Sequence, residues 1–408
     1  MKKPALKKFV SGAASLLCGC LLTAAAFADT ALPEWSGSIK SLNLYGEAAP
    51  ADLFPDYRLS SNRARLNMDW QLDESWQFTA SLDHQYLWSD PSKAFPLASV
   101  GYNRHLDMDR IWQHGDHGAS RLQVDRLALH WRTGKVDTTL GRQAVGFGRI
   151  LIYSPLDVIA PFAPDAIDTD IRSGIDSLHS ILNYGLDGQL GAIAVWGEES
   201  RHDSLLATWS DNRADLDILM IAGRLRGHHM LGAGLAGNLG TLGLKAEFSV
   251  HKNRDSDETA GVLLEVYTLA AIETWYRFES GISLIAQYLY NGPGANDPKD
   301  YLKVLASPPL QEGLTHLLGQ HYLIAAPSYE LHPLATLQGL LLYNLADDSA
   351  LVRPTLDLSL ADNLSLQLFW TWNIGQKPQR VFSLPFIEPR SEFGLRGDSG
   401  GLFLKWFF

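Results

Sequence analysis

The sequence has 408 residues and a formal net charge of −11, from 45 acidic and 34 basic side chains. Such an acidic balance argues against nucleic acid as a partner, because phosphates attract basic surfaces. The mean hydropathy is −0.07, although a tenth of the residues are aromatic. This combination is typical of membrane β-barrels, in which lipid-facing and lumen-facing residues alternate along each strand.

The N-terminal residues 1–28 predict a cleaved secretory signal peptide. Four lysines precede a long apolar stretch, and Ala26-Phe27-Ala28 provides a small-x-small cleavage site. Both cysteines of the chain lie in this segment, so the mature chain has no disulfide or thiol chemistry. No later segment has the 18 or more apolar residues that predict a transmembrane helix.

From residue 35 onward, apolar and polar residues alternate in runs of about ten, separated by turn residues. The run 76–88 shows the pattern, because it begins and ends in tryptophan and alternates between them. Twelve residues at ~3.3 Å rise and ~40° tilt span roughly 30 Å. That length fits an apolar band of about 25 Å with an aromatic girdle on each side. The residues predicted to lie at the membrane interface are Trp70, Trp76, Trp88, Trp370, Trp372, Trp406 and Phe408.

The predicted fold is all-β: one antiparallel transmembrane β-barrel over residues 29–408, with about eighteen strands and an in-folded constriction loop. When both chain ends lie in the periplasm, short turns and long outer connections must alternate. They do so only if the weak run Ser204–Ser210 is a strand; sixteen strands is the alternative. The predicted strands are 37–47, 57–72, 76–88, 121–132, 135–143, 175–184, 188–197, 204–209, 215–226, 229–238, 241–251, 262–278, 281–290, 319–330, 334–346, 349–360, 363–374 and 395–408.

The last ten residues, Ser399–Phe408, form an alternating strand whose even positions are apolar and which ends in phenylalanine. In a soluble protein such a strand would be an exposed hydrophobic edge, whereas in a barrel it closes the wall. It resembles the terminal strand of Gram-negative outer-membrane β-barrels. The resemblance implies a location in the outer membrane and recognition by the barrel-assembly machinery. A docked tail of a soluble β domain is the alternative.

The segment Leu140–Asp176 contains Gly141-Arg142-Gln143, Gly146-Phe147-Gly148-Arg149 and three prolines. The prolines are incompatible with a plain membrane strand. This order resembles porin-type barrels of the alginate-export kind, in which a strand ends in a G-R-Q element and the next loop folds into the lumen. The remaining substrate-binding pattern of alginate exporters is not found, so the resemblance concerns the class of barrel and not the solute.

The 144–174 loop is acidic, and we expect its aspartates to lie opposite strands whose inward faces carry Arg63, Arg65 and Arg126. An acidic loop opposite a basic wall gives a transverse field that selects charged or polar solutes. In the alternative, the same charges pair with one another and plug the lumen. The predicted pore-lining and constriction residues are Arg63, Arg65, Arg126, Arg142, Arg149, Asp157, Asp165, Asp168, Asp170 and Arg172.

Two clusters have the residue types of metal ligands, but neither predicts a site. His114, Asp116 and His117, with His105 nearby, have loose spacing and fit a solvated loop better. The acidic run 165–170 lacks the glycine and terminal glutamate of an EF-hand loop. We therefore predict no metal and no other cofactor.

The sequence predicts an outer-membrane channel for small polar or charged solutes. Its partners would be outer-membrane lipid, the assembly machinery and a small-molecule solute. One alternative is a barrel that sheathes a protein partner, such as a haem protein. Another is an outer-membrane hydrolase, but G-x-S-x-G and H-E-x-x-H motifs are absent, so no catalytic residue and no enzymatic activity are predicted.

Overall fold

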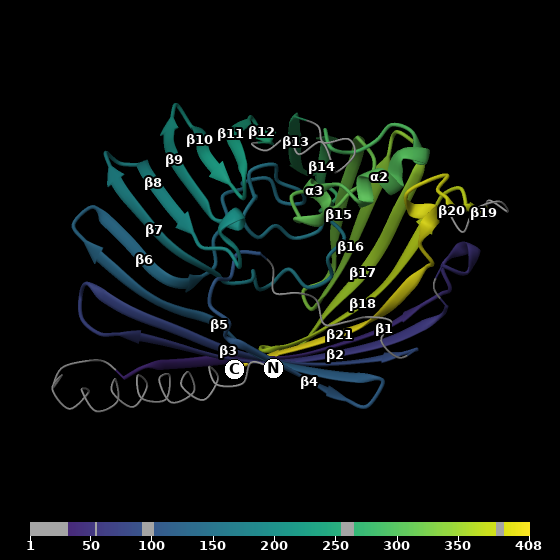
Figure 1. The fold of residues 1–408 in the computed structure, drawn as a ribbon, viewed down its shortest axis with the longest axis horizontal. Helices are drawn as coiled ribbons and strands as arrows, with labels where there is room; N and C mark the ends of the chain where they lie inside the picture. The colour runs from purple at the N-terminus through teal and green to yellow at the C-terminus, as the bar shows by residue number, and fades with distance from the viewer. Residues whose placement is uncertain (1–31, 54, 92–101, 254–264, 381–386) are drawn as a thin grey trace.

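The computed structural model describes residues 32–53, 55–91, 102–253, 265–380 and 387–408. The predicted signal peptide, residues 1–28, lies outside them. Eighteen strands form one antiparallel barrel wall, which confirms the predicted fold and strand number (Figure 1). The wall closes because β1 (Glu34–Gly46) pairs with β2 (Tyr57–Gln71) on one side and with the last strand, β21 (Ser399–Phe407), on the other.

Every predicted strand has a counterpart in the wall. The weak run 204–210 is part of β9, so short turns and long outer connections alternate along the chain as predicted. Short turns lie at the end of the barrel where β1 begins and β21 ends. The remaining strands of the wall are β3 (Trp76–Asp90), β5 (Gly118–Thr133), β6 (Val136–Gln143), β7 (Ile175–Tyr184), β8 (Gly188–Val195), β9 (Ser204–Arg213), β10 (Leu216–Leu225), β11 (His228–Leu239), β12 (Leu242–Asn253), β13 (Val266–Arg277), β14 (Ser283–Asn291), β15 (His321–His332), β16 (Ala335–Asn344), β17 (Ser349–Ala361) and β18 (Leu364–Ile374).

One additional strand, β4 (Asp109–His114), was not predicted. It pairs with the first part of β5, beyond the point where β6 turns away from the wall. The other elements lie in the outer connections: β19 (Gln379–Arg380), β20 (Ile387–Glu388), α2 (Tyr301–Leu305), α3 (Pro308–Gln311) and the short 3-10 turns η2 (Pro50–Asp52), η3 (Ser200–His202), η4 (Pro298–Asp300) and η5 (Phe393–Leu395). Within the described ranges, no helix has the length and hydropathy needed to cross a membrane.

A β-bulge in β5 changes which of its side chains face the lumen. Ser81 of β3 is opposite Arg126, but the next residue, Leu82, is opposite Val124, so one residue of β5 is left over. The left-over residue is Asp125, and the bulge turns Asp125 and Arg126 to the same side of the sheet. Two charged side chains are therefore adjacent on the inner face of the wall.

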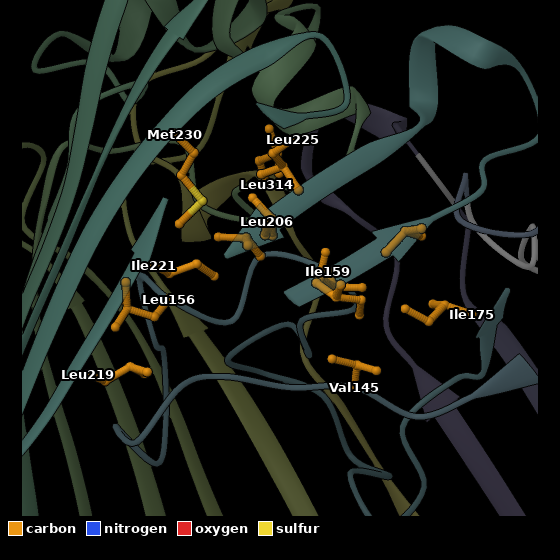
Figure 2. Packing of buried hydrophobic residues seen from close by; sticks show 13 residues of the cluster. Val145, Leu156, Ile159, Ile175, Leu206, Leu219, Ile221, Leu225, Met230 and Leu314 are labelled. Atoms are coloured by element: carbon orange, nitrogen blue, oxygen red, sulfur yellow. The ribbon is translucent and has the colours of Figure 1, made fainter. Parts of the chain in front are cut away.

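The inside of the barrel contains two apolar clusters, both built between the inner face of the wall and the connections inside it. The larger cluster joins loop residues to β7–β11 (Figure 2). The second joins the loop to β13–β17 and to η5. The lumen is therefore filled by packed side chains along the part of the wall from β7 to β17.

Candidate functional site

The loop 144–174 connects two neighbouring strands, β6 and β7, but it crosses the lumen to the opposite wall between them. Glu247 of β12 accepts hydrogen bonds from two successive loop N–H groups, at 2.6 and 3.0 Å, and Glu273 of β13 accepts the next at 2.9 Å. Gln287 of β14 accepts from the N–H of Tyr153 at 3.2 Å and donates to its carbonyl at 2.7 Å. These three strands hold the loop by its backbone, so the predicted in-folded loop is confirmed.

The next part of the loop lies against the wall through apolar side chains. Leu156 and Ile159 are 0% and 1% exposed and belong to the larger cluster (Figure 2). Two glycines on the inner face of β11 make this close approach possible, because a Cβ atom at Gly232 would lie only 2.5 Å from Leu156 Cδ2, and one at Gly234 only 3.0 Å from Cδ1. The loop thus closes this side of the lumen by hydrophobic packing.

The acidic end of the loop returns across the lumen to the strands that close the barrel. Lys40 Nζ of β1 is 2.8 Å from carboxylate oxygens of both Asp168 and Asp170. Lys405 Nζ of β21 is 3.0 Å from Asp170, and Lys40 and Lys405 are directly opposite each other in the sheet. Two like charges in that position destabilise a sheet. Asp168 and Asp170 neutralise the two lysines and thereby hold the loop at the seam, the line where β1 and β21 pair to close the barrel.

A second ionic contact holds the loop near β17. Arg396, in the connection before β21, is 2.7 Å from the Asp165 carboxylate, and Arg353 of β17 donates to the Asp165 carbonyl at 2.8 Å. Burial raises the pKa of Asp165, but the two guanidinium groups outweigh it, so that the net pKa lies below its usual range. Burial also raises the pKa of Asp170, but the hydrogen bonds and charges of Lys40 and Lys405 have the larger, opposite effect. The net pKa of Asp170 therefore lies below its usual range as well.

The expectation that these aspartates face Arg63, Arg65 and Arg126 is wrong. Arg63 Nε is 2.6 Å from Asp83, whereas Arg65 Nη1 and Arg126 Nη1 are 2.7 and 2.6 Å from Asp125. The reason is that the wall supplies nearer carboxylates: Asp83 on the inner face of β3, and Asp125, which the bulge in β5 turns inward. Arg126 still contacts the loop, since it donates to the carbonyl of Arg172.

The four remaining predicted residues, Arg142, Arg149, Asp157 and Arg172, have partners in the loop, at its base or on β10. Arg142 is only 2% exposed and donates to both carboxylate oxygens of Asp176, at 2.7 and 2.9 Å, so its expected place on the surface of the pore is wrong. Arg172 Nη1 is 2.6 Å from Asp157. The pKa of Asp157 is raised by burial, against the opposing effect of Arg172. Arg149 Nη1 is 3.6 Å from Asp217.

The structure adds charged groups that the sequence analysis missed: Lys40, Lys405, Arg396 and Arg104, which pairs with Asp125 at 2.7 Å. Lys40 and Lys405 could have been found, since pairing the first strand with the last places them side by side on the inner face. Arg104 and Arg396 lie in long connections, where alternation gives no signal.

The inner wall between β17 and β5 carries a cluster of ion pairs. Four arginines surround Asp83 and Asp125, namely Arg63, Arg65, Arg104 and Arg126. Arg353 and Arg396 share the single residue Asp165. The two lysines at the seam are matched by two aspartates. We call these eight cationic side chains and the five aspartates that they contact the basic arc; within this set, cations outnumber carboxylates.

The predicted interface residues lie near the ends of the strands. Trp76 stacks on Trp131 with centroids 6.0 Å apart, near the short turns, and Trp406 contacts Phe408 at 5.1 Å at the same end. Trp70, near the end of β2, is half-buried. Trp88, Trp370 and Trp372 lie toward the opposite ends of β3 and β18. Their contact with the membrane interface stays a prediction.

The histidines of the 102–120 segment do not converge. His114 hydrogen-bonds to the Ser120 hydroxyl at 2.9 Å, His117 to the Ser89 carbonyl at 2.8 Å and His105 to the Gly197 carbonyl at 3.2 Å. In the part of the chain that the structure describes, no group of three or more ligand-type side chains could hold a metal ion.

Solved structures with a similar fold are outer-membrane porins. The BenF-like porin from Pseudomonas fluorescens Pf-5 has a TM-score of 0.60 at 9% identity, covering 92% of this chain and 98% of that one. OccAB4 of Acinetobacter baumannii has a TM-score of 0.57 at 10% identity, covering 93% and 99%. OccK5 (OpdH) of Pseudomonas aeruginosa has a TM-score of 0.57 at 9% identity, covering 92% and 98%.

No protein-family model matches the sequence, and no curated protein does. The identity to the solved structures is low, so the likeness concerns the fold. With its closed eighteen-strand wall and in-folded loop, the chain has the β-barrel fold of outer-membrane porins, as the terminal strand and the G-R-Q element predicted.

Proposed function

We propose that this protein is an outer-membrane channel for small solutes, and that it favours anionic ones. The observation that carries the proposal is the basic arc, which has more guanidinium and ammonium groups than carboxylates. The opposite side of the lumen is filled by the apolar clusters and by the loop. Ions and solutes would then pass along the charged side.

The cause of the selectivity would be electrostatic. A solute moving along the basic arc loses part of its hydration in a narrow, low-dielectric space, where fixed charges act more strongly than at an open surface. The side chain of Arg63 is 25% exposed, so it remains accessible beside its partner Asp83. Anions would therefore be concentrated and cations excluded along this path.

Channel activity is proposed in preference to enzymatic activity or a sheath around a protein partner. The buried carboxylates Glu247 and Glu273 accept hydrogen bonds from the loop backbone, which gives them a structural role. Assembly through the terminal strand β21, by the machinery that inserts outer-membrane barrels, is part of the same proposal.

The test is the reversal potential of the purified protein in planar bilayers under a salt gradient. Wild-type channels should be anion-selective, and a variant with Arg63→Gln and Arg353→Gln should be less so. Arg132→Gln is the matched control, because Arg132 is exposed near the short turns and pairs with Asp137 away from the arc. Cation selectivity of the wild type, or no change in the double variant, would contradict the proposal.

A further inference from the structure

Three basic side chains form a row across the outer surface of β10, β11 and β12, which are neighbours in the wall (Figure 1). Arg224 is directly opposite His229, and His229 is directly opposite Lys252. Their neighbours in sequence are buried on the lumen side: Leu225, His228 and His251. Because successive residues of a strand point to opposite faces, the three basic side chains point outward. We call Arg224, His229 and Lys252 the basic row.

The basic row lies at the outer end of the barrel, above an apolar surface. Arg224 and Lys252 are the last residues but one of β10 and β12, and His229 is the second residue of β11. The next outward row toward the short turns is apolar and consists of Ala222, Leu231 and Val250. The basic row is therefore at the level of lipid head groups in the outer leaflet, with the lipid-facing surface directly below it.

Apolar side chains also border the basic row at both of its ends. Leu205 of β9 is directly opposite Arg224, and Val266 of β13 is directly opposite Lys252. The two side chains are 62% and 48% exposed. A ligand that reaches the basic row from the membrane would thus meet apolar surface on three sides.

The charges of the basic row are poorly compensated within the chain. Like charges directly opposite each other in a sheet are destabilising. Lys252 is 3.6 Å from Glu265, but both side chains are exposed. Arg224 forms no ion pair with any described residue, and its Nε atom is buried without a hydrogen-bond partner. The lysines at the seam differ, because two loop aspartates neutralise Lys40 and Lys405.

Other sectors of the outer rim have a different composition. The outward residues near the outer ends of β14 and β18 include Tyr288 and Trp372, which are 39% and 44% exposed. Aromatic side chains of this kind are the usual girdle of a membrane barrel. The basic row is therefore a local departure from the girdle, confined to three adjacent strands.

We propose that the basic row binds the phosphate group of an anionic lipid in the outer leaflet. Guanidinium, imidazole and ammonium groups all donate N–H to phosphate oxygens, and charge strengthens these hydrogen bonds. The acyl chains would lie on the apolar surface below the row. A soluble phosphate ion would gain only exposed ionic contacts, which are weak. The apolar border thus favours a lipid as the source of the phosphate.

The test is lipid binding to the purified full-length barrel in mild detergent, measured by native mass spectrometry. Diphosphorylated lipid A is the probe, and its dephosphorylated form is the control lipid. The wild type should prefer the phosphorylated form. The variant with Arg224→Gln and Lys252→Gln should bind it roughly thirtyfold more weakly, because each basic residue at an anionic membrane surface contributes about a factor of five.

Arg132→Gln with Arg277→Gln is the matched control, because both arginines are exposed near the short turns, at the other end of the barrel. This variant should keep the wild-type affinity. Faster gel migration of unboiled samples shows that each variant has folded. The phosphorylated lipid should also raise the temperature at which the wild type loses that migration, and it should not do so for the Arg224 and Lys252 variant.

Three outcomes would overturn the proposal. One is equal binding of the two lipids by the wild type, and another is an unchanged affinity in the Arg224 and Lys252 variant. Complete displacement of the lipid by inorganic phosphate is the third, because it would show a site for any phosphate and not for a lipid. A wild type that binds neither lipid belongs to the first outcome and would leave Glu265 as the counter-ion of the basic row.

Discussion

The two sides of the lumen are closed by different forces. Along β7–β11, loop residues such as Leu156 and Ile159 are buried against the wall. Along the basic arc, the same loop is held by ion pairs that are partly exposed, such as Asp168 at 24% and Asp170 at 35%. Hydrophobic burial is strong and does not depend on the protonation of side chains, whereas exposed ion pairs are weak, are screened by salt and are lost when the carboxylate is protonated. The apolar side therefore fixes the loop, and the charged side is suited to conduction.

The largest effect is expected when the wall cannot close, because the packing on both sides of the lumen depends on a closed barrel. Deletion of Trp406–Phe408 should abolish assembly, since Trp406 pairs with both Ile39 of β1 and Leu364 of β18, and Phe407 pairs with Ser38 of β1. The measurement is the amount of heat-modifiable barrel in outer-membrane fractions. Normal amounts of the truncated protein would contradict the account.

A substitution on the apolar side should lower stability more than one on the charged side. Leu156→Ala removes a fully buried side chain and should cost about 2–5 kcal/mol if the site does not collapse. The temperature at which the barrel loses its fast gel migration should fall. Leu151→Ala is the control, because Leu151 belongs to the same loop but is 64% exposed. Equal losses for both variants would show that the loop is not fixed by this packing.

A substitution on the charged side should change selectivity more than stability. Replacing Asp165, Asp168 and Asp170 with asparagine leaves Arg396, Lys40 and Lys405 without their carboxylates. The reversal potential in a salt gradient should shift toward the value expected for an anion-selective channel. An unchanged reversal potential would mean that this end of the loop lies away from the conduction path.

The barrel could be predicted from the sequence because alternation and turn chemistry are local signals. The weak strand β9 was found through the parity of the connections. Which cations the loop aspartates meet could not be predicted in the same way, because it depends on the path of the loop across the lumen. The bulge at Asp125, which gives Arg65 and Arg126 a different partner, has no signal in the alternation either. Arg142 of the G-R-Q element was predicted to line the constriction, but it is buried and pairs with Asp176 of the neighbouring strand.

A smaller effect is expected from acid. The pKa values of Asp165 and Asp170 lie below the usual range, so these carboxylates stabilise the docked loop above the ordinary carboxyl pKa. That contribution is lost as the pH falls through the lowered values. Anion selectivity should increase over the same acidic window in the wild type, and the triple asparagine variant should lack this change. A shift confined to neutral pH would contradict the assignment to these two groups.

The central claim is that solutes pass along the basic arc and not along the apolar side. Single thiols test it directly, because the predicted mature chain has no cysteine. Gln367→Cys places a thiol on the inner face of β18, beside the arc, and Ile221→Cys places one in the buried cluster of β10. We expect a bulky thiol reagent to lower the single-channel conductance of the first variant and leave the second unchanged. Block of the second variant alone, or of neither, would contradict the account.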